Sequence, residues 1–190
     1  MDSFDQSEAD TIIFSAYIVL RESGYSGPVV IDTTDTDAYV TSAAISQQQP
    51  GMLCIKRKNE LILCRGMVTE EMSECIVQLL CMTGCDANSG FYGKGKMSIY
   101  DRVVKSSDAR QLLLHCGDSL DLKEEVLDDL LCFIRKFIYG DNKSTNMAEA
   151  RAAKWKTLKK KSFIHLPPDL DSLRLHYRRV NFLAYLGKVT

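Results

Sequence analysis

The chain has 190 residues, which is enough for one ordinary domain or for a small domain with an appended helical region. Hydrophobic residues make up 45% of the chain and charged residues 26%, a balance typical of a globular protein that excludes a disordered tail or a coiled coil. The net charge of 24 − 25 = −1 excludes a globally basic protein that coats nucleic acid.

The charge is divided unevenly along the chain. From Lys143 to the end, eleven Lys and Arg residues stand against three Asp and Glu residues, which gives +8. The preceding residues therefore carry 13 − 22 = −9. A basic end behind an acidic body predicts a polyanion or an acidic protein as the partner.

The sequence carries no signal for a membrane or for secretion. No stretch approaches the eighteen apolar residues of a membrane-spanning helix, and the polar, acidic start at Met1 is unlike a secretory signal. Most of the seven cysteines lie in apolar runs, so we expect buried, reduced thiols in an intracellular protein, with the nucleus as one compartment that fits. Cys81 and Cys85 have helical spacing, but no second ligand pair follows, which disfavours zinc.

Helices and strands are predicted to alternate in the first half of the chain, because helical and apolar-run patterns succeed one another. Glycine, proline and capping residues set the expected bounds. In chain order the elements are helix 8–22, buried strand 28–31, helix 38–49, strand 52–56, strand 60–64 and helix 69–84. This order predicts an α/β arrangement of layers.

The second half predicts helices alone. The patterns favour helices over 96–105, 107–116, 122–139, 147–160 and 169–186. The main joints are the polar stretch 140–144 and Leu166-Pro-Pro168. We therefore expect an all-helical region behind the α/β part.

Asp35 and Asp37 directly follow the strand predicted at 28–31, where ligands of open α/β sheets bind. In extended backbone the two carboxylates would point to one side and suit Mg²⁺ or Mn²⁺. The alternative, which spacing alone favours, is that Asp35 caps the next helix and Asp37 is an acid in its first turn.

Glu8, Asp10 and Asp86 are the other acidic candidates. Residues two apart in a helix lie about 200° apart around its axis, so Glu8 and Asp10 can share a metal only if Glu8 lies at the helix entry. Solvated surface carboxylates are the alternative for this pair.

A glycine-rich stretch lies between the predicted helices that end at Gly84 and begin at Lys96. Residues 90–96 nearly match the phosphate loop of ATPases, but Met97 replaces the hydroxyl residue and no strand precedes the loop, so that assignment is rejected. A glycine turn that opens a helix offers backbone N–H groups to one phosphate, through Gly93, Lys94, Gly95 and Lys96. A tight helix–helix turn with solvated lysines is the alternative.

Trp155 lies within a basic run that contains Lys154, Lys156 and residues 159–161. Such a run could form a phosphate-binding face. The alternative, which we favour from the sequence, is a solvated helix with Trp155 turned into the core.

Three of these motifs together resemble the flap-endonuclease-like nucleases of the PIN-like superfamily. The resembling segments are Glu8-Ala-Asp10, Asp35-Thr-Asp37 and Met82-Thr-Gly-Cys-Asp86, the last followed by Gly93-Lys-Gly-Lys96. Uncharacterised animal proteins with this core also resemble the chain at Asn146–Arg151 and Leu166–Pro168. Each motif alone is weak, and their shared order carries the resemblance.

The resemblance implies a fold and a division into domains. It implies an α/β fold with a partial, Rossmann-like parallel sheet, then a helix–two-turn–helix and an all-helical extension. The corresponding ranges are a nuclease core over 1–86, the helix–two-turn–helix and helical region over 87–142, and a basic helical extension over 143–190.

The resemblance also implies an activity, which is metal-dependent hydrolysis of phosphodiesters in structured DNA or RNA, with DNA favoured. Two divalent ions, Mg²⁺ or Mn²⁺, would be held by Glu8, Asp10, Asp35, Asp37 and Asp86. The catalytic residues among these would be Asp35, Asp37 and Asp86, while the turn from Gly93 to Lys96 would bind a phosphate of the nucleic acid.

The chain departs from the family at its start, since two further acidic positions of the family would lie before Met1. We therefore expect either a partial chain or a shortened relative with an incomplete site and an open sheet edge that could pair with a protein partner. Two hypotheses follow from this, a metal-dependent nuclease and a non-catalytic protein that binds nucleic acid or another protein.

Overall fold

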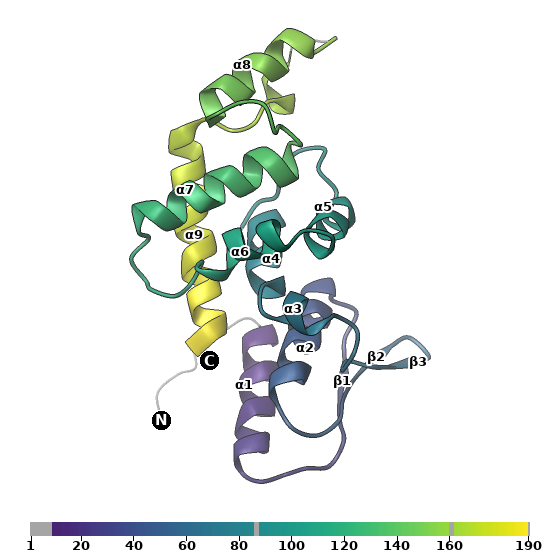
Figure 1. Cartoon of the computed structure of the whole chain (residues 1–190). Coiled ribbons are helices and arrows are strands. Elements are labelled where there is room, and N and C mark those ends of the chain that lie inside the picture. Colours follow the sequence, from purple (N-terminus) through teal and green to yellow (C-terminus); the bar gives the residue numbers. More distant parts are fainter. Residues whose placement is uncertain (1–8, 86–87, 160–161, 190) are drawn as a thin grey trace. The chain divides into compact units, whose positions relative to one another are not determined.

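Figure 1 shows a computed structural model of the chain, and it describes residues 9–85, 88–159 and 162–189. The chain folds as two compact units, residues 1–76 and 77–189, and each is described by itself. Unit 1 holds the sheet, and unit 2 consists of helices and loops.

The sheet of unit 1 has three strands, β1 (Val29–Asp32), β2 (Leu53–Arg57) and β3 (Glu60–Leu63), in that order. Strands β1 and β2 are parallel and are connected through helix α2 (Thr36–Gln48), whereas β3 runs antiparallel to β2. The predicted α/β class is confirmed, whereas the predicted partial parallel sheet is found only in the pair β1 and β2, because β3 is antiparallel. Only two residues separate β2 from β3, and a parallel connection needs a dozen or more.

One face of the sheet carries the core of unit 1. Helix α1 (Ala9–Glu22) and α2 contribute to one cluster with the strands. Its buried members are Phe14, Tyr17, Ile31, Ala38, Leu53, Ile55 and Cys64. On the opposite face Val30 and Leu63, which oppose Cys54 from either side, are each 50% exposed. The prediction that strand 28–31 is buried on both faces is therefore wrong, since this cluster covers only one of them.

Strand β1 forms an edge of this sheet. Within the part of the chain that the structure describes, β1 pairs with β2 alone. The expected open edge is therefore present in the described sheet, and a protein partner at that edge stays a prediction.

Arg21 ties the end of α1 to two loops of unit 1. Its side chain is buried, and its guanidinium donates to the carbonyl oxygens of Tyr25, Gly27 and Met52 at 3.0, 2.7 and 3.0 Å. The same group lies over the ring of Tyr17, 5.0 Å from its centre. These contacts fix the chain where it enters β1 and β2.

The helix predicted over 69–84 is two helices, α3 (Glu70–Ser73) and α4 (Ile76–Thr83). Thr69 caps α3 as expected, by accepting from the backbone N–H of Met72. The backbone N–H of Cys75 then donates to the carbonyl oxygen of Met72 at 3.1 Å, three residues back instead of four, so the α-helical bonding stops before α4. The single-helix prediction is wrong for this reason.

Unit 2 is helical, as predicted, and within its described residues the only strand-like pairing is an isolated bridge between Cys85 and Asn88. After α4 its elements are α5 (Lys96–Val104), α6 (Ser107–Leu114), α7 (Glu124–Phe133), the π-helix η1 (Ile134–Ile138), α8 (Met147–Thr157), the 3₁₀ turn η2 (Phe163–His165) and α9 (Leu170–Val189). Among the helices of the described residues, none is both long enough and apolar enough to cross a membrane.

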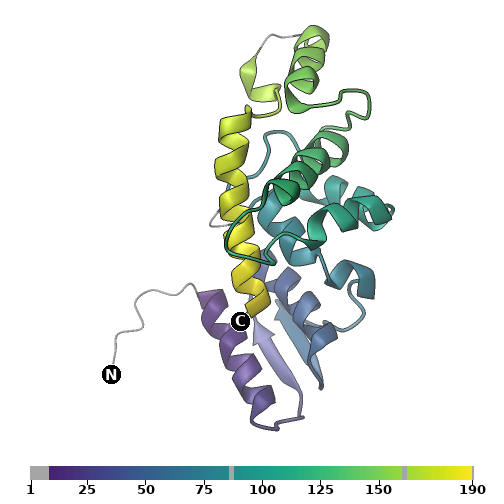
Figure 2. The same ribbon diagram turned by 60° about the vertical axis from the view of Figure 1, so that its left-hand side comes forward.

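Helix α9 supplies a large part of the core of unit 2. Leu173, Tyr177, Val180 and Ala184 recur at helical spacing on one face of α9 and are buried, and the helix runs beside α7 (Figure 2). Asn181 on the same helix is also buried; its amide accepts from Gly117 N–H and donates to the carbonyl oxygen of Ser119. These bonds fasten the loop after α6 to α9.

Candidate nucleic-acid interface

The loop that follows α4 is held by a close contact between two glycines. Gly84 has a φ of +114°, and a side chain added there would lie 2.7 Å from the backbone nitrogen of Gly90. A side chain on Gly90 would collide with the carbonyl oxygen of Thr83. Asn88 fastens the loop inward by donating to the carbonyl oxygen of Cys81 at 3.0 Å. The second half of the loop is thus set in a defined position before α5.

The glycine-rich turn begins α5 as the sequence predicts. Gly93 takes a φ of +67°, Lys94 N–H donates to the carbonyl oxygen of Phe91 at 3.0 Å, and Gly95 is the N-cap without a side-chain bond to the helix. Lys96 is the first residue of the helix. Added side chains at Gly93 and Gly95 would meet nothing within 4 Å, so this turn is open to an approaching ligand.

The side chain of Lys94 does not extend freely into solvent. This differs from the alternative of a tight helix–helix turn with solvated lysines. The ammonium nitrogen of Lys94 lies 4.6 Å from the centre of the Tyr139 ring, a cation–π arrangement. Burial lowers the pKa of Lys94, and the nearby positive charges of Lys154 and Arg102 lower it further. The interface therefore gathers three cations from the turn, α5 and α8.

Among the residues that the structure describes, no carboxylate lies within ion-pair distance of Lys94, Arg102 or Lys154. Arg102 instead donates to the carbonyl oxygen of Phe137 at 2.9 Å. A bound phosphate would relieve the mutual repulsion of the three side chains.

The π-helix η1 sets the position of Tyr139. Tyr139 N–H donates to the carbonyl oxygen of Ile134 at 2.9 Å, five residues back, and the wider turn ends at this tyrosine. The predicted helix over 122–139 therefore changes its winding over its last turn. Tyr139 then donates to the carbonyl oxygen of Leu166, and burial raises its pKa to about 12, so the phenol stays neutral.

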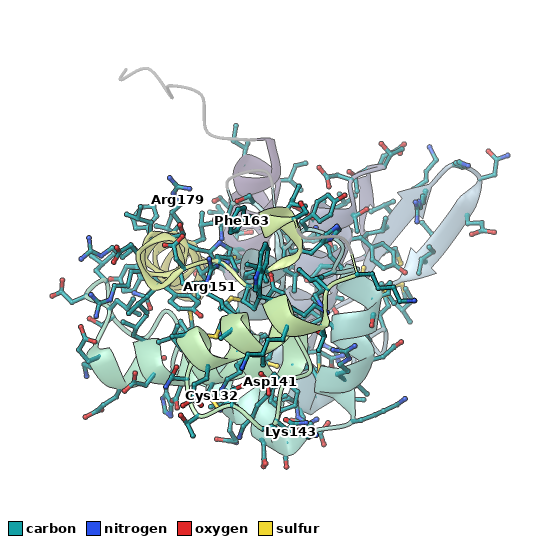
Figure 3. All side chains as sticks on the ribbon, turned by 90° about the horizontal axis from the view of Figure 1, so that it is seen from above. Cys132, Asp141, Lys143, Arg151, Phe163 and Arg179 are labelled. Atoms are coloured by element: carbon teal, nitrogen blue, oxygen red, sulfur yellow. The ribbon has the colours of Figure 1, made fainter. Side chains whose placement is uncertain are left out.

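An aromatic pair lies between α8 and η2. The rings of Trp155 and Phe163 stack with centres 5.2 Å apart and planes 15° apart, and Phe163 is 76% exposed. Trp155 is half-buried and stacks on exposed Phe163 instead of on a core residue. The expectation that Trp155 turns into the core is therefore wrong. Figure 3 shows Phe163 and Arg151 on the side of α8 that faces α9, with Asp141 and Lys143 on its other side.

The acidic candidates of unit 1 lie at the start of α2. Asp35 is the N-cap, and its carboxylate accepts from the backbone N–H of Asp37 at 2.8 Å. The capping alternative is thus confirmed, and the idea that both residues lie in extended backbone is wrong, because Asp37 is already in the helix. At the end of β1, Asp32 pairs instead with Lys56 at 2.7 Å.

The remaining ligand candidates are not brought together by the described residues. Glu8 and Asp86 lie outside those residues, and Asp10 lies in the first turn of α1. Across residues 9–85, 88–159 and 162–189, no group of three or more His, Cys, Asp or Glu side chains could hold a metal ion. The metal site of Glu8, Asp10, Asp35, Asp37 and Asp86 therefore stays a prediction.

Sequence reasoning found the turn of Gly93, Lys94, Gly95 and Lys96, but it missed Arg102 and Tyr139. Arg102 is an ordinary basic residue in the last turn of a helix, and no motif contains Tyr139. No local pattern could have joined Tyr139 to Lys94, because 45 positions separate them and the π-turn is not visible in apolar spacing.

Comparison of the chain with protein-family models, with curated protein sequences and with solved structures finds no match.

Proposed function

We propose that this protein binds nucleic acid through unit 2, with the backbone phosphates held by Lys94 at the open start of α5, by Arg102 in the last turn of α5 and by Lys154 of α8. The single observation that carries the proposal is that Lys94, held on the ring of Tyr139 with Arg102 and Lys154 near it, and these two cations have no carboxylate within ion-pair distance among the described residues. DNA is the expected substrate class before RNA, in keeping with the resemblance of the glycine-rich turn to a helix–two-turn–helix.

Local chemistry supports a phosphate as the ligand. The N-terminus of α5 carries a partial positive charge, and Gly95 leaves its first turn without a side-chain cap. Lys94 is held by the ring of Tyr139, so little side-chain entropy remains to be lost when a phosphate binds. The net charge of +8 from Lys143 to the end of the chain attracts a polyanion to the same unit over distances longer than a direct contact.

The test is a salt series of binding measurements with fluorescent duplex DNA, single-stranded DNA and duplex RNA. We expect affinity to fall as salt rises, and Lys94→Gln to reduce the slope of log K against log salt by about 1, since one phosphate contact is removed. Arg102→Gln and Lys154→Gln should reduce the slope similarly. Each should weaken binding by comparable amounts for nucleic acids of different base sequence.

Lys123→Gln is the matched control. Lys123 is exposed and precedes α7, and the sixteen positions to Tyr139 correspond to roughly 20 Å of helix. This variant should bind like the native protein, and all variants should unfold at the native temperature. Binding without salt dependence, or equal losses from Lys94→Gln and Lys123→Gln, would refute the proposed interface.

A metal-dependent nuclease is the second candidate function. The observation that favours it is the position of Asp35 and Asp37 after β1, at the carboxyl end of the parallel strand pair. These two carboxylates do not complete a metal site within the described residues, so no catalytic step is derived from them.

Asp35→Asn separates this candidate from the capping role. Asparagine is as good an N-cap as aspartate, so the variant keeps α2 while it removes a negatively charged ligand. A nuclease predicts Mn²⁺-dependent cleavage of branched or duplex substrates that chelator and Asp35→Asn both abolish. No cleavage by the native protein, or undiminished cleavage by Asp35→Asn, would exclude it, and the binding proposal would stand.

A further inference from the structure

A pocket of about 200 Å³ lies in unit 2 and is lined in part by Tyr139, the residue whose ring carries Lys94. Its wall includes Phe91 and Tyr92 from the glycine-rich loop, Tyr139 after η1, Ile164 of η2 and His176 of α9. Pockets for drug-sized ligands are roughly 300–1,000 Å³, so this one suits a single flat ring system rather than a large ligand.

The pocket and the cation cluster share Tyr139. One face of its ring carries the ammonium group of Lys94, 4.6 Å from the ring centre, and the residue also lines the pocket. Phe91 meets Tyr139 edge to face, with ring centres 6.1 Å apart. The ring of Tyr139 therefore connects the pocket to a positive charge.

His176 is one of the polar residues of the wall, together with Ser89 and Ser172. Its Nε2 lies 3.1 Å from the carbonyl oxygen of Met82, which can only accept, so Nε2 carries the hydrogen and Nδ1 the lone pair. Burial holds the pKa of His176 below its usual range, so the ring stays neutral. The His176 ring also packs against Phe91 with centres 5.0 Å apart, so it is fixed in this orientation.

We propose that this pocket receives one unpaired nucleobase, whose neighbouring phosphate is bound by Lys94. The inference rests on the proposed function. It adds that unit 2 distinguishes an unpaired nucleotide from paired ones. An aromatic wall stacks with any base, while the ammonium group of Lys94 on the Tyr139 ring matches the phosphate that a base carries through its sugar. Fully paired duplex offers the phosphate without the base.

Tyr92 and Ile164 form exposed parts of the wall, where an entering base would pass. Tyr92 is 59% exposed and its ring lies 5.4 Å from that of His165, while Ile164 is 53% exposed. Substitutions at Ile164 can therefore obstruct the pocket without disturbing a buried core. Ile164→Trp is the obstructing variant, and Leu175→Trp is its control, since Leu175 is similarly exposed on α9 and does not line the pocket.

The experiment compares three duplexes of equal length and charge pattern: one fully paired, one with a single unpaired nucleotide, and one with an abasic residue at that position. We expect the unpaired nucleotide to bind about tenfold more tightly than the abasic residue, the size that stacking of one base supplies. Ile164→Trp should remove this difference, and Leu175→Trp should retain it.

The outcomes separate the inference from the proposed function. Salt-dependent binding of all three duplexes with equal affinity would overturn the base pocket and leave the phosphate interface in place. Binding of none of them would overturn both. A free mononucleotide that competes at the same concentration as the unpaired duplex would show that the pocket takes nucleotides rather than a strand, which also overturns the inference.

A photoreactive base supplies a second readout that needs no variant. A 4-thiothymidine at the unpaired position should crosslink to Tyr92 or Tyr139, which peptide mass spectrometry identifies. Crosslinks confined to unit 1 or to α6 would contradict the pocket.

Discussion

Replacement of Asn181 by alanine tests how the loop after α6 is fastened to α9. Asn181 is 2% exposed, and its amide oxygen accepts from Gly117 N–H at 2.9 Å. Its amide nitrogen donates to the carbonyl oxygens of Ser119 and Leu120 at 2.7 and 3.3 Å. Alanine removes all three bonds and changes no charge.

The expected loss of unfolding free energy follows from these bonds. Gly117 is itself buried, and an N–H left there without an acceptor costs about 1–3 kcal/mol. The bond to Ser119 contributes about 0.5–1.5 kcal/mol, and the longer one to Leu120 contributes less. Alanine regains a few tenths of this through its higher helix propensity. We therefore expect Asn181→Ala to lower the free energy of unfolding by about 3 kcal/mol.

Urea unfolding followed by tryptophan fluorescence measures this loss, because Trp155 is the only tryptophan of the chain and lies in unit 2. Asn142→Ala is the matched control, since Asn142 is exposed and the same atoms are deleted. A loss below about 1 kcal/mol for Asn181→Ala, or a loss equal to that of the control, would refute the reasoning.

Four further changes are expected to act as follows. Gly117→Ala should prevent native folding of unit 2 or cost more than about 3 kcal/mol in the same urea experiment, because Gly117 has a φ of +85° and an added side chain would lie 2.6 Å from the backbone of α9. Arg21→Lys should destabilise unit 1 by about 2 kcal/mol, since one ammonium cannot reach three carbonyl groups in the geometry of the guanidinium, and faster hydrogen exchange in β2 would report it. Asp35→Ala should cost about 1 kcal/mol through the lost cap, whereas Asp35→Asn should be nearly neutral, which thermal unfolding distinguishes. Burial lowers the pKa of His176, so the unfolded chain binds more protons here and stability should fall as pH drops below the ordinary histidine value of 6.5; His176→Gln should flatten this part of a stability–pH curve.

Local signals predicted much of the fold because its helices begin at recognisable caps. Asp35 and Thr69 accept bonds from the first turns of α2 and α3, and the run of five predicted helices after residue 95 is found in the structure. The sequence could not show that the helix breaks between α3 and α4 or that η1 winds as a π-helix, since both depend on which carbonyl oxygen one backbone N–H, of Cys75 or of Tyr139, selects.

The candidate site was less predictable than the fold. The glycine-rich turn is a local feature and was found, but its cation cluster depends on Arg102, Lys154 and Tyr139, which come from distant parts of the chain.

The exposed face of β1 has a similar explanation. Val30 sits in an apolar run, and only the side on which α1 and α2 pack decides that its neighbour Ile31 is the buried one.

The contact between Gly84 and Gly90 has a consequence for variation of this protein. The two backbones touch directly, so the smallest side chain at either position meets main-chain atoms, which cannot rotate away as a side chain can. A second substitution that shortens a neighbouring side chain therefore cannot make room for the added one. In a saturation library selected for folded protein, Gly84 and Gly90 should both retain glycine. Exposed Gly95 should accept many residues. Exposed Gly93, with its positive φ, should accept chiefly asparagine and aspartate.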